Sequence, residues 1–249
     1  MSITQPQLTI FNDSESLSKA VAENWRKSAL QANQEGRIVS FLISGGNTPR
    51  SVYTRLADPK FRDSVPWPTI HLFWGDERCV PPDHLESNFR MVRETLIDLI
   101  PIPENNIHRI RGENDPELEA KRYGDEILSC LCSARNNIPR FDWVILGLGA
   151  DGHTASLFPG KDFFSESSDV CSVSKHPQTG QKRITLTMPV INQAARVTFL
   201  VTGKTKANVV ADIFEQTSQG KEYPAGRVYP REGILQWYLD TEAASLLKK

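Results

Sequence analysis

Short apolar runs alternate along the chain with longer segments in which apolar residues recur every three or four positions. The runs predict strands at residues 8–11, 38–43, 70–74, 107–110, 143–146, 183–187, 197–202 and 234–239. The periodic segments predict helices at residues 15–34, 49–56, 88–99, 116–131, 204–216 and 240–247, and the polar residues 160–182 predict a loop. We therefore expect one α/β domain over residues 1–249, with a doubly wound, mostly parallel sheet and helices on both faces.

The predicted strand 143–146 is followed by glycines and then by Asp151, Gly152 and His153. Ligands bind beyond the carboxyl ends of the strands in open α/β sheets, so an acid and a base fall where chemistry is expected. The alternative is a turn whose glycines only let the chain pack closely on the sheet. A dinucleotide-binding fingerprint fits poorly, because the glycines lie past the middle of the chain and His153 follows them.

A second glycine turn follows the predicted strand 38–43 and reads Ser-Gly-Gly-Asn-Thr-Pro. Its backbone N–H groups, its hydroxyls and the helix that starts there suit a phosphate oxyanion. The candidate contacts are Ser44, Gly45, Gly46, Asn47 and Thr48. The turn lacks the Gly-Lys-Ser/Thr of a nucleotide triphosphate loop, which disfavours such a ligand, whereas a sugar phosphate is well accommodated. A tight turn whose glycines have no ligand explains the pattern equally well.

Three charged residues, Asp76, Glu77 and Arg78, come shortly after the predicted strand 70–74. Arg78 can hold a phosphate or a carboxylate through two parallel hydrogen bonds, and Asp76 can orient a base or bind a substrate hydroxyl. Taken alone, a solvated loop with an internal ion pair is the better explanation of these charges.

Further cations lie at the ends of other predicted strands. Lys204 and Lys206 follow Gly203 at the start of a predicted helix, where the helix dipole disfavours a cation unless an anion is bound. Arg183 opens the predicted strand 183–187 and can add another cation. An ordinary charge at the edge of a strand is an equal explanation for Arg183.

The overall composition excludes several classes of protein. The chain carries 29 Lys and Arg against 30 Asp and Glu, and its basic residues are not interleaved with aromatics, which argues against nucleic acid as a partner. The sequence contains no apolar segment of membrane-spanning length, and its first residues do not read as a signal peptide. We therefore expect a cytoplasmic protein that binds neither nucleic acid nor membrane.

The four cysteines are scattered without C-x-x-C pairs, and the five histidines form no H-x-H or H-x-x-x-H pair. We therefore expect reduced thiols and no protein-bound metal. The sequence leaves open the oligomeric state, a monomer included. It also leaves open whether residues 160–182 close over a ligand or remain a solvated loop.

Taken together and in order, these motifs resemble the 6-phosphogluconolactonase family. The resemblance rests on the motifs at residues 44–49, 74–78, 147–156, 183–187 and 202–207. It implies a modified Rossmann-like fold and the hydrolysis of 6-phosphoglucono-δ-lactone to 6-phosphogluconate in the oxidative pentose phosphate pathway. It also implies a small phosphorylated sugar lactone as substrate and no metal or organic cofactor.

The resemblance implies roles for individual positions. His153 matches the family's proposed general base, and Asp76 and Asp151 match acidic residues beside the lactone. The positions that match the phosphate site are the turn at Ser44, Arg78, Arg183 and Lys206. Lys206 matches better than Lys204, since the family's lysine lies three residues after the glycine.

The chemistry expected of His153 is general base catalysis. A neutral imidazole accepts a proton from the attacking water and returns it to the ring oxygen as that bond breaks, which is typically worth about a hundredfold to ten-thousandfold. Backbone N–H groups near Gly45 or Gly152 can stabilise the developing oxyanion, and Gly152 is counted among the substrate contacts. A structural histidine hydrogen-bonded to backbone is the alternative for His153.

Two other functions fit the motifs less well. A glucosamine-6-phosphate deaminase or isomerase shares the fold and the Asp-Gly-His turn, but its motif continues Ile-Ala-Phe-Asn-Glu-Pro. Here Thr154 begins Thr-Ala-Ser-Leu-Phe-Pro, and no glutamate follows until Glu166. A non-catalytic sugar-phosphate sensor would keep the cations and would need neither His153 nor Asp151.

Overall fold

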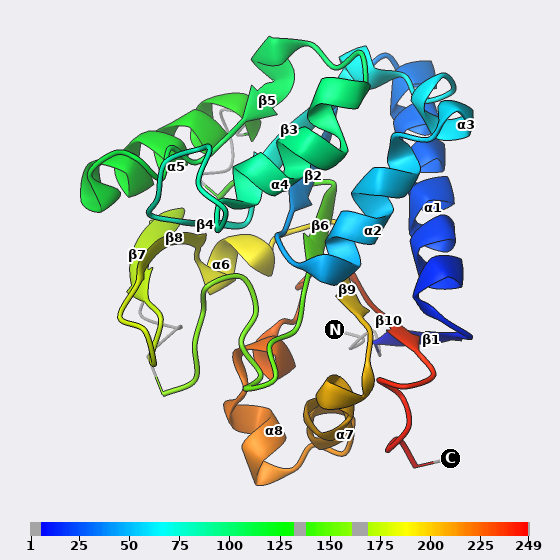
Figure 1. The fold of residues 1–249 in the computed structure, drawn as a ribbon, viewed down its shortest axis with the longest axis vertical. Coiled ribbons are helices and arrows are strands. Elements are labelled where there is room, and N and C mark those ends of the chain that lie inside the picture. The colour runs from blue at the N-terminus through cyan, green and yellow to red at the C-terminus, as the bar shows by residue number, and fades with distance from the viewer. Residues whose placement is uncertain (1–5, 132–137, 161–168, 249) are drawn as a thin grey trace.

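A parallel sheet of seven strands forms the centre of the computed structural model, which describes residues 6–131, 138–160 and 169–248. The strand order is β1-β10-β9-β6-β2-β3-β5, and every pairing between neighbours is parallel (Figure 1). The strands are β1 (Gln7–Phe11), β2 (Val39–Ile43), β3 (Ile70–Trp74), β5 (Ile107–His108), β6 (Trp143–Leu146), β9 (Arg196–Val201) and β10 (Ile234–Asp240). The prediction of a mostly parallel sheet is confirmed.

The order of the strands places a switch point at the centre of the sheet. From β2 the chain adds β3 and β5 toward one edge, returns to β6 beside β2, and adds β9 and β10 toward the other edge. Where the strand order reverses in this way, the loops after the two central strands diverge and leave a crevice at their carboxyl ends. The loops after β2 and β6 begin at this crevice.

Helices α1 (Ser14–Gln34), α2 (Asn47–Leu56) and α4 (Asn88–Thr95) pack side by side (Figure 1). Asp13 caps α1, because its carboxylate accepts the N–H of Ser16 at 2.7 Å. The other helices are α3 (Pro59–Arg62), α5 (Pro116–Leu131), α6 (Met188–Ile191), α7 (Ala207–Phe214) and α8 (Ser218–Glu222). Short 3-10 turns are η1 (Trp67–Thr69), η2 (Ile97–Leu99), η3 (Glu104–Asn106), η4 (Lys204–Lys206) and η5 (Pro224–Arg227).

Aromatic packing joins α1 to the middle of the sheet. Trp25 of α1 stacks on Phe41 of β2 with ring centroids 3.8 Å apart, and Trp143 of β6 packs against both rings. All three side chains are buried. This part of the core fixes β2 and β6, the two strands from which the central loops start.

A second, three-stranded antiparallel sheet in the order β4-β8-β7 lies apart from the first. It consists of β4 (Asp76–Arg78), β7 (Cys171–Lys175) and β8 (Lys182–Leu186). The prediction of a loop at residues 160–182 is therefore wrong at β7, where the polar sequence Cys-Ser-Val-Ser-Lys becomes a strand by pairing with β8. Residues 161–168 of that loop lie outside the described residues.

Several other elements differ from the predictions, among them the predicted helix 88–99, whose α-helical part ends at Thr95. The predicted strand 107–110 ends at His108, and the predicted helix 204–216 is a 3-10 turn, η4, followed by the shorter α7. The predicted closing helix 240–247 does not form, because Asp240 ends β10 and its carboxylate accepts the N–H groups of Gly203 and Ala243. Among the described helices, none has the length and apolar character needed to cross a membrane.

Candidate active site

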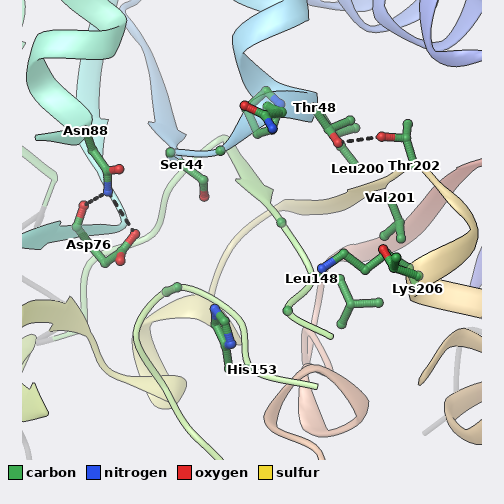
Figure 2. Close-up of a pocket in the computed structure, with 18 of the residues that line it drawn as sticks. Ser44, Thr48, Asp76, Asn88, Leu148, His153, Leu200, Val201, Thr202 and Lys206 are labelled. Carbon is green, nitrogen blue, oxygen red and sulfur yellow. Dashed lines mark hydrogen bonds between the residues drawn. The ribbon is translucent and has the colours of Figure 1, made fainter. Parts of the chain in front are cut away.

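The loops at the carboxyl ends of β2, β3, β6 and β9 enclose a cavity of about 420 Å³ at the switch point (Figure 2). Ten residues predicted for the site line this cavity, namely Ser44, Gly45, Gly46, Asn47, Thr48, Asp76, Arg78, His153, Arg183 and Lys206. The structure brings these residues together from five separate segments of the chain. Asp151 and Gly152 lie beside the cavity without lining it, and Lys204 does not line it either.

The turn after β2 forms one wall of the cavity. The Ser44 hydroxyl donates to the carbonyl oxygen of Ile145 at 2.6 Å, so it ties β2 to β6. Gly46 precedes the first residue of α2, and no side chain among the described residues caps this helix. The first N–H groups of α2 are thus available to an anion. Thr48 and Thr202 join their hydroxyls at 2.7 Å across the cavity wall (Figure 2).

Arg78 and Arg183 occupy directly paired positions on the antiparallel strands β4 and β8. Paired residues project on the same face of a sheet, so the two guanidinium groups are neighbours. The Nε atom of each arginine is buried and has no hydrogen-bond partner among the described residues. Burial and the nearby Arg78 lower the pKa of Arg183, although arginine keeps its charge in proteins. Two adjacent cations with unused donors favour a bound anion.

Lys206 of η4 brings a further cation to the cavity wall (Figure 2). Burial lowers the pKa of its ammonium group, and the nearby Asp151 opposes this shift. Lys206 lines the cavity and Lys204 does not, and the role of Lys206 toward a ligand stays a prediction. The cations of the cavity come from β4, β8 and η4.

His153 and Asp151 form a hydrogen-bonded pair in the turn after β6, with Nδ1 of the imidazole 2.6 Å from Oδ1 of the carboxylate. This hydrogen bond, followed by the charge of His153, lowers the pKa of Asp151 to about 2, against the effect of burial. An ionised carboxylate only accepts hydrogen bonds, so the proton of a neutral His153 is on Nδ1. Nε2 is then the basic nitrogen, on a side chain that keeps 28% of its surface exposed.

The backbone conformation and the close packing of this turn require glycine at position 152. Gly152 has a backbone φ of 80°, and a Cβ at this position would lie 2.2 Å from the ring of Tyr223. Its carbonyl oxygen accepts the N–H of Ala225 at 3.1 Å. The expected contact of Gly152 with a substrate has no support in this geometry, because the residue packs against the segment 223–225 behind the cavity.

Asp76 is a buried residue that accepts hydrogen bonds through its carboxylate and through its backbone oxygen. The Ser156 hydroxyl donates to Oδ2 at 2.6 Å, and the Asn88 amide donates to the backbone oxygen of Asp76 at 3.0 Å (Figure 2). Asn88 itself lines the cavity, and the sequence did not single it out. Its only signal is its place directly after Ser87, which caps α4 by accepting the N–H of Arg90 with its hydroxyl.

The donor set of the cavity suits an anionic organic ligand. Within the described ranges, no group of three or more His, Cys, Asp or Glu side chains is arranged to hold a metal ion. Among the same residues, Asp76 is the one carboxylate that lines the cavity, opposite three basic side chains and His153. The arrangement can bind a phosphate and place a nitrogen base beside the rest of the ligand.

A parallel, Rossmann-like sheet with a cationic cavity at its switch point defines the class of protein. The chain belongs to the family described as glucosamine-6-phosphate isomerases/6-phosphogluconolactonase, whose profile matches residues 12–237. Both activities act on phosphorylated sugars, so membership alone does not separate them.

Individual relatives are named more narrowly. A curated 6-phosphogluconolactonase of Aggregatibacter actinomycetemcomitans is 43% identical over 205 residues, which cover 82% of this chain and 86% of that protein. Among solved structures, the devB protein has a TM-score of 0.91 and 37% identity, covering 97% of this chain and 99% of its own. The 6-phosphogluconolactonase of Trypanosoma brucei has a TM-score of 0.82 and 29% identity, covering 98% and 99%.

Proposed function

We propose that this chain hydrolyses 6-phosphoglucono-δ-lactone to 6-phosphogluconate in the oxidative pentose phosphate pathway, with His153 as the general base. The activity is supported by relatives named 6-phosphogluconolactonase that are 43% identical over most of the chain. The observation that carries the role of His153 is its hydrogen bond to Asp151 at the edge of a cavity lined by Arg78 and Arg183. The enzyme is a carboxylic ester hydrolase.

The cations would hold the phosphate end of the substrate. Arg78 and Arg183 offer unpaired Nε donors, Lys206 adds a third charge, and the first N–H groups of α2 add partial positive charge. The phosphate does not react, so this binding free energy serves to place the lactone carbonyl. Such positioning converts a bimolecular attack by water into an oriented one.

His153 would carry the proton transfers. Nε2 accepts a proton from water while the water oxygen bonds to C1, and the carbonyl oxygen becomes an oxyanion. When the C1–ring-oxygen bond breaks, the imidazolium returns the proton to the ring oxygen, which gives the carboxylic acid and a free hydroxyl. Asp151 holds Nδ1–H and stabilises the imidazolium that forms between the two steps.

The rival activity, deamination of glucosamine 6-phosphate, is less well supported. Its sequence motif supplies a glutamate close after the Asp-Gly-His turn to assist ring opening. Here Phe158 stands at the position of that glutamate, and Ser156 in the same segment donates to Asp76. Asp76 is also the one carboxylate that lines the cavity among the described residues, so a second acid is lacking there.

The test is to measure 6-phosphogluconate formation from freshly made lactone, corrected for spontaneous hydrolysis, beside ammonia release from glucosamine 6-phosphate. We expect a rate of lactone hydrolysis that rises with enzyme concentration and no ammonia. Ammonia release without lactone hydrolysis would support the deaminase. Binding of 6-phosphogluconate without any acceleration would support a sugar-phosphate sensor and overturn the proposal.

The place of action and the assembly state belong to the same proposal. We expect the enzyme to act in the cytoplasm as a monomer. Sedimentation of the active enzyme would contradict this if activity were found only in a dimer.

A further inference from the structure

The corner between β4 and α4 holds a buried carboxylate that the mechanism above does not use. Successive residues of a strand point to opposite faces. In β4, Asp76 and Arg78 line the cavity, whereas Glu77 between them does not and keeps only 2% of its surface exposed. Burial raises the pKa of the Glu77 carboxyl, against the effect of hydrogen bonds from Asn88 and Phe89.

Glu77 is fully engaged with the start of α4. Its Oε1 accepts the N–H of Asn88 at 2.8 Å, and its Oε2 accepts the N–H of Phe89 at 2.7 Å and the Ser87 hydroxyl at 3.1 Å. Oε1 also accepts the N–H of Arg78, the next residue of its own strand, at 2.7 Å. One carboxylate therefore ties the backbone of β4 to the first turn of α4.

This connection between β4 and α4 positions Asn88, which lines the cavity. Its Nδ2 donates to the backbone oxygen of Asp76, an atom that can only accept, so the orientation of the amide is fixed. The amide oxygen then points away from that carbonyl, and it packs so closely on Gly45 that a Cβ there would lie 1.9 Å from it. Asn88 thus contacts both the Asp76 segment and the turn after β2 (Figure 2).

We propose that Glu77 is a positioning residue for the reaction. By anchoring the first turn of α4 to β4, it fixes the positions of Asn88 and Asp76 in the cavity wall relative to each other. This inference rests on the proposed lactonase function. It assigns to Asn88 a place in the substrate cavity and to Glu77 the task of keeping it there. Loss of Glu77 shifts Asn88 and Asp76 together, and a displacement of about 1 Å in such groups can cost about a hundredfold in rate.

If Glu77 had a purely structural role, its replacement would affect kcat/KM no more than replacement of another buried carboxylate outside the site. Glu119 provides this control. Glu119 is equally buried, with 1% of its surface exposed, and accepts the N–H of Arg111 at 2.7 Å and the Asn114 amide at 3.1 Å. It lies outside the cavity wall. Glu119 also forms an ion pair with Arg122 at 2.6 Å, so Glu119→Gln tests the loss of an equally buried, hydrogen-bonded carboxylate away from the site.

The experiment is a double-mutant cycle on lactone hydrolysis, using Glu77→Gln, Asn88→Ala and the double variant, with Glu119→Gln beside them. We expect Glu77→Gln to lower kcat/KM by about tenfold to a hundredfold and Glu119→Gln to leave it unchanged, at temperatures where all are folded. In the Asn88→Ala background, Glu77→Gln should have a much smaller effect, because residues that act through one another are not additive.

Several results would overturn the inference. One is an equal effect of Glu77→Gln with and without Asn88, and another is the same loss of kcat/KM in Glu119→Gln. If Glu77→Gln does not fold, the test rests on Asn88→Ala alone. A kcat/KM equal to that of wild type in Asn88→Ala then contradicts the proposal. A wild-type protein without lactonase activity would instead refute the proposed function, so the two failures are distinguishable.

Discussion

Among the described residues, two histidines hydrogen-bond to carboxylates at nearly the same distance but in different surroundings. His153 meets Asp151 at 2.6 Å beside the cavity, and His108 meets Glu126 at 2.8 Å where β5 faces α5. The His153 side chain keeps 28% of its surface exposed, whereas that of His108 keeps 8%. His108 also stacks on Phe73 with ring centroids 4.3 Å apart.

The difference lies in the second ring nitrogen. Nε2 of His108 is 2.9 Å from Nδ1 of His71, so both nitrogens of His108 have partners. Among the described hydrogen bonds, the ring of His153 is engaged through Nδ1 alone. A histidine–carboxylate pair is therefore a candidate base only where the other nitrogen reaches a ligand, and the pair at His108 is a structural link.

The largest expected difference is in activity after removal of each histidine. We expect His153→Ala to lower kcat/KM for the lactone by about a hundredfold to ten-thousandfold, since general base catalysis is lost. His108→Gln should keep wild-type kcat/KM in the fraction that is folded. Equal losses in the two variants, measured at matched folded fraction, would remove the distinction between the pairs.

The carboxylate of the catalytic pair should have a smaller effect. Asp151→Asn keeps an oxygen that can accept from Nδ1 but removes the negative charge that stabilises the imidazolium. We expect kcat to fall, by less than the loss in His153→Ala, with little change in KM. Steady-state kinetics measure kcat and KM separately, and a rise in KM with constant kcat would point to a binding role for Asp151 instead.

The carboxylate of the structural pair should affect stability instead of rate. Glu126 accepts from His108 and pairs with Arg122, so Glu126→Gln weakens two charge-assisted contacts. We expect a loss of about 1–3 kcal/mol in the free energy of unfolding. Urea unfolding checks this value, and kcat/KM serves as the control. An impaired kcat/KM at full folding would connect this pair to catalysis.

The smallest expected effect is the pH dependence at His71. Burial and the neighbouring His108 lower the pKa of His71, so the unfolded chain binds the proton more readily. The stabilising contribution is present above about pH 6.5 and is lost as the pH falls through the folded pKa. Between about pH 7 and pH 5, wild type should lose more stability than His71→Gln. Unfolding curves that give the same loss of stability between the two pH values for wild type and His71→Gln would contradict this prediction.

Local signals in the sequence predicted the central strands and several helices well. β3 and α5 begin and end at the predicted residues, because a buried apolar run and a proline-started amphipathic segment are visible without tertiary context. β7 was missed because its polar residues become a strand only through pairing with β8. The closing helix failed because Asp240 is engaged with Gly203, thirty-seven positions away in sequence.

The site was predicted through its motifs and missed where it depends on contacts distant in sequence. His153, Arg78 and Lys206 follow strands whose carboxyl ends meet, so the topology places them in one cavity. Asn88 reaches the cavity only because Glu77 anchors the start of α4. Neither the position of Asn88 in the cavity nor the contact of Glu77 with α4 corresponds to a periodicity or a motif spacing in the sequence.

The central claim is that His153 is a general base whose Nε2 is available to water, and chemical rescue tests it most directly. Lactone hydrolysis by His153→Ala is measured with increasing imidazole, and the rate of the same imidazole solution without enzyme is subtracted. We predict a rate that rises with imidazole and depends on enzyme, because the small molecule replaces the missing base. Residual activity in His153→Ala near that of wild type, with no response to imidazole, would contradict the claim.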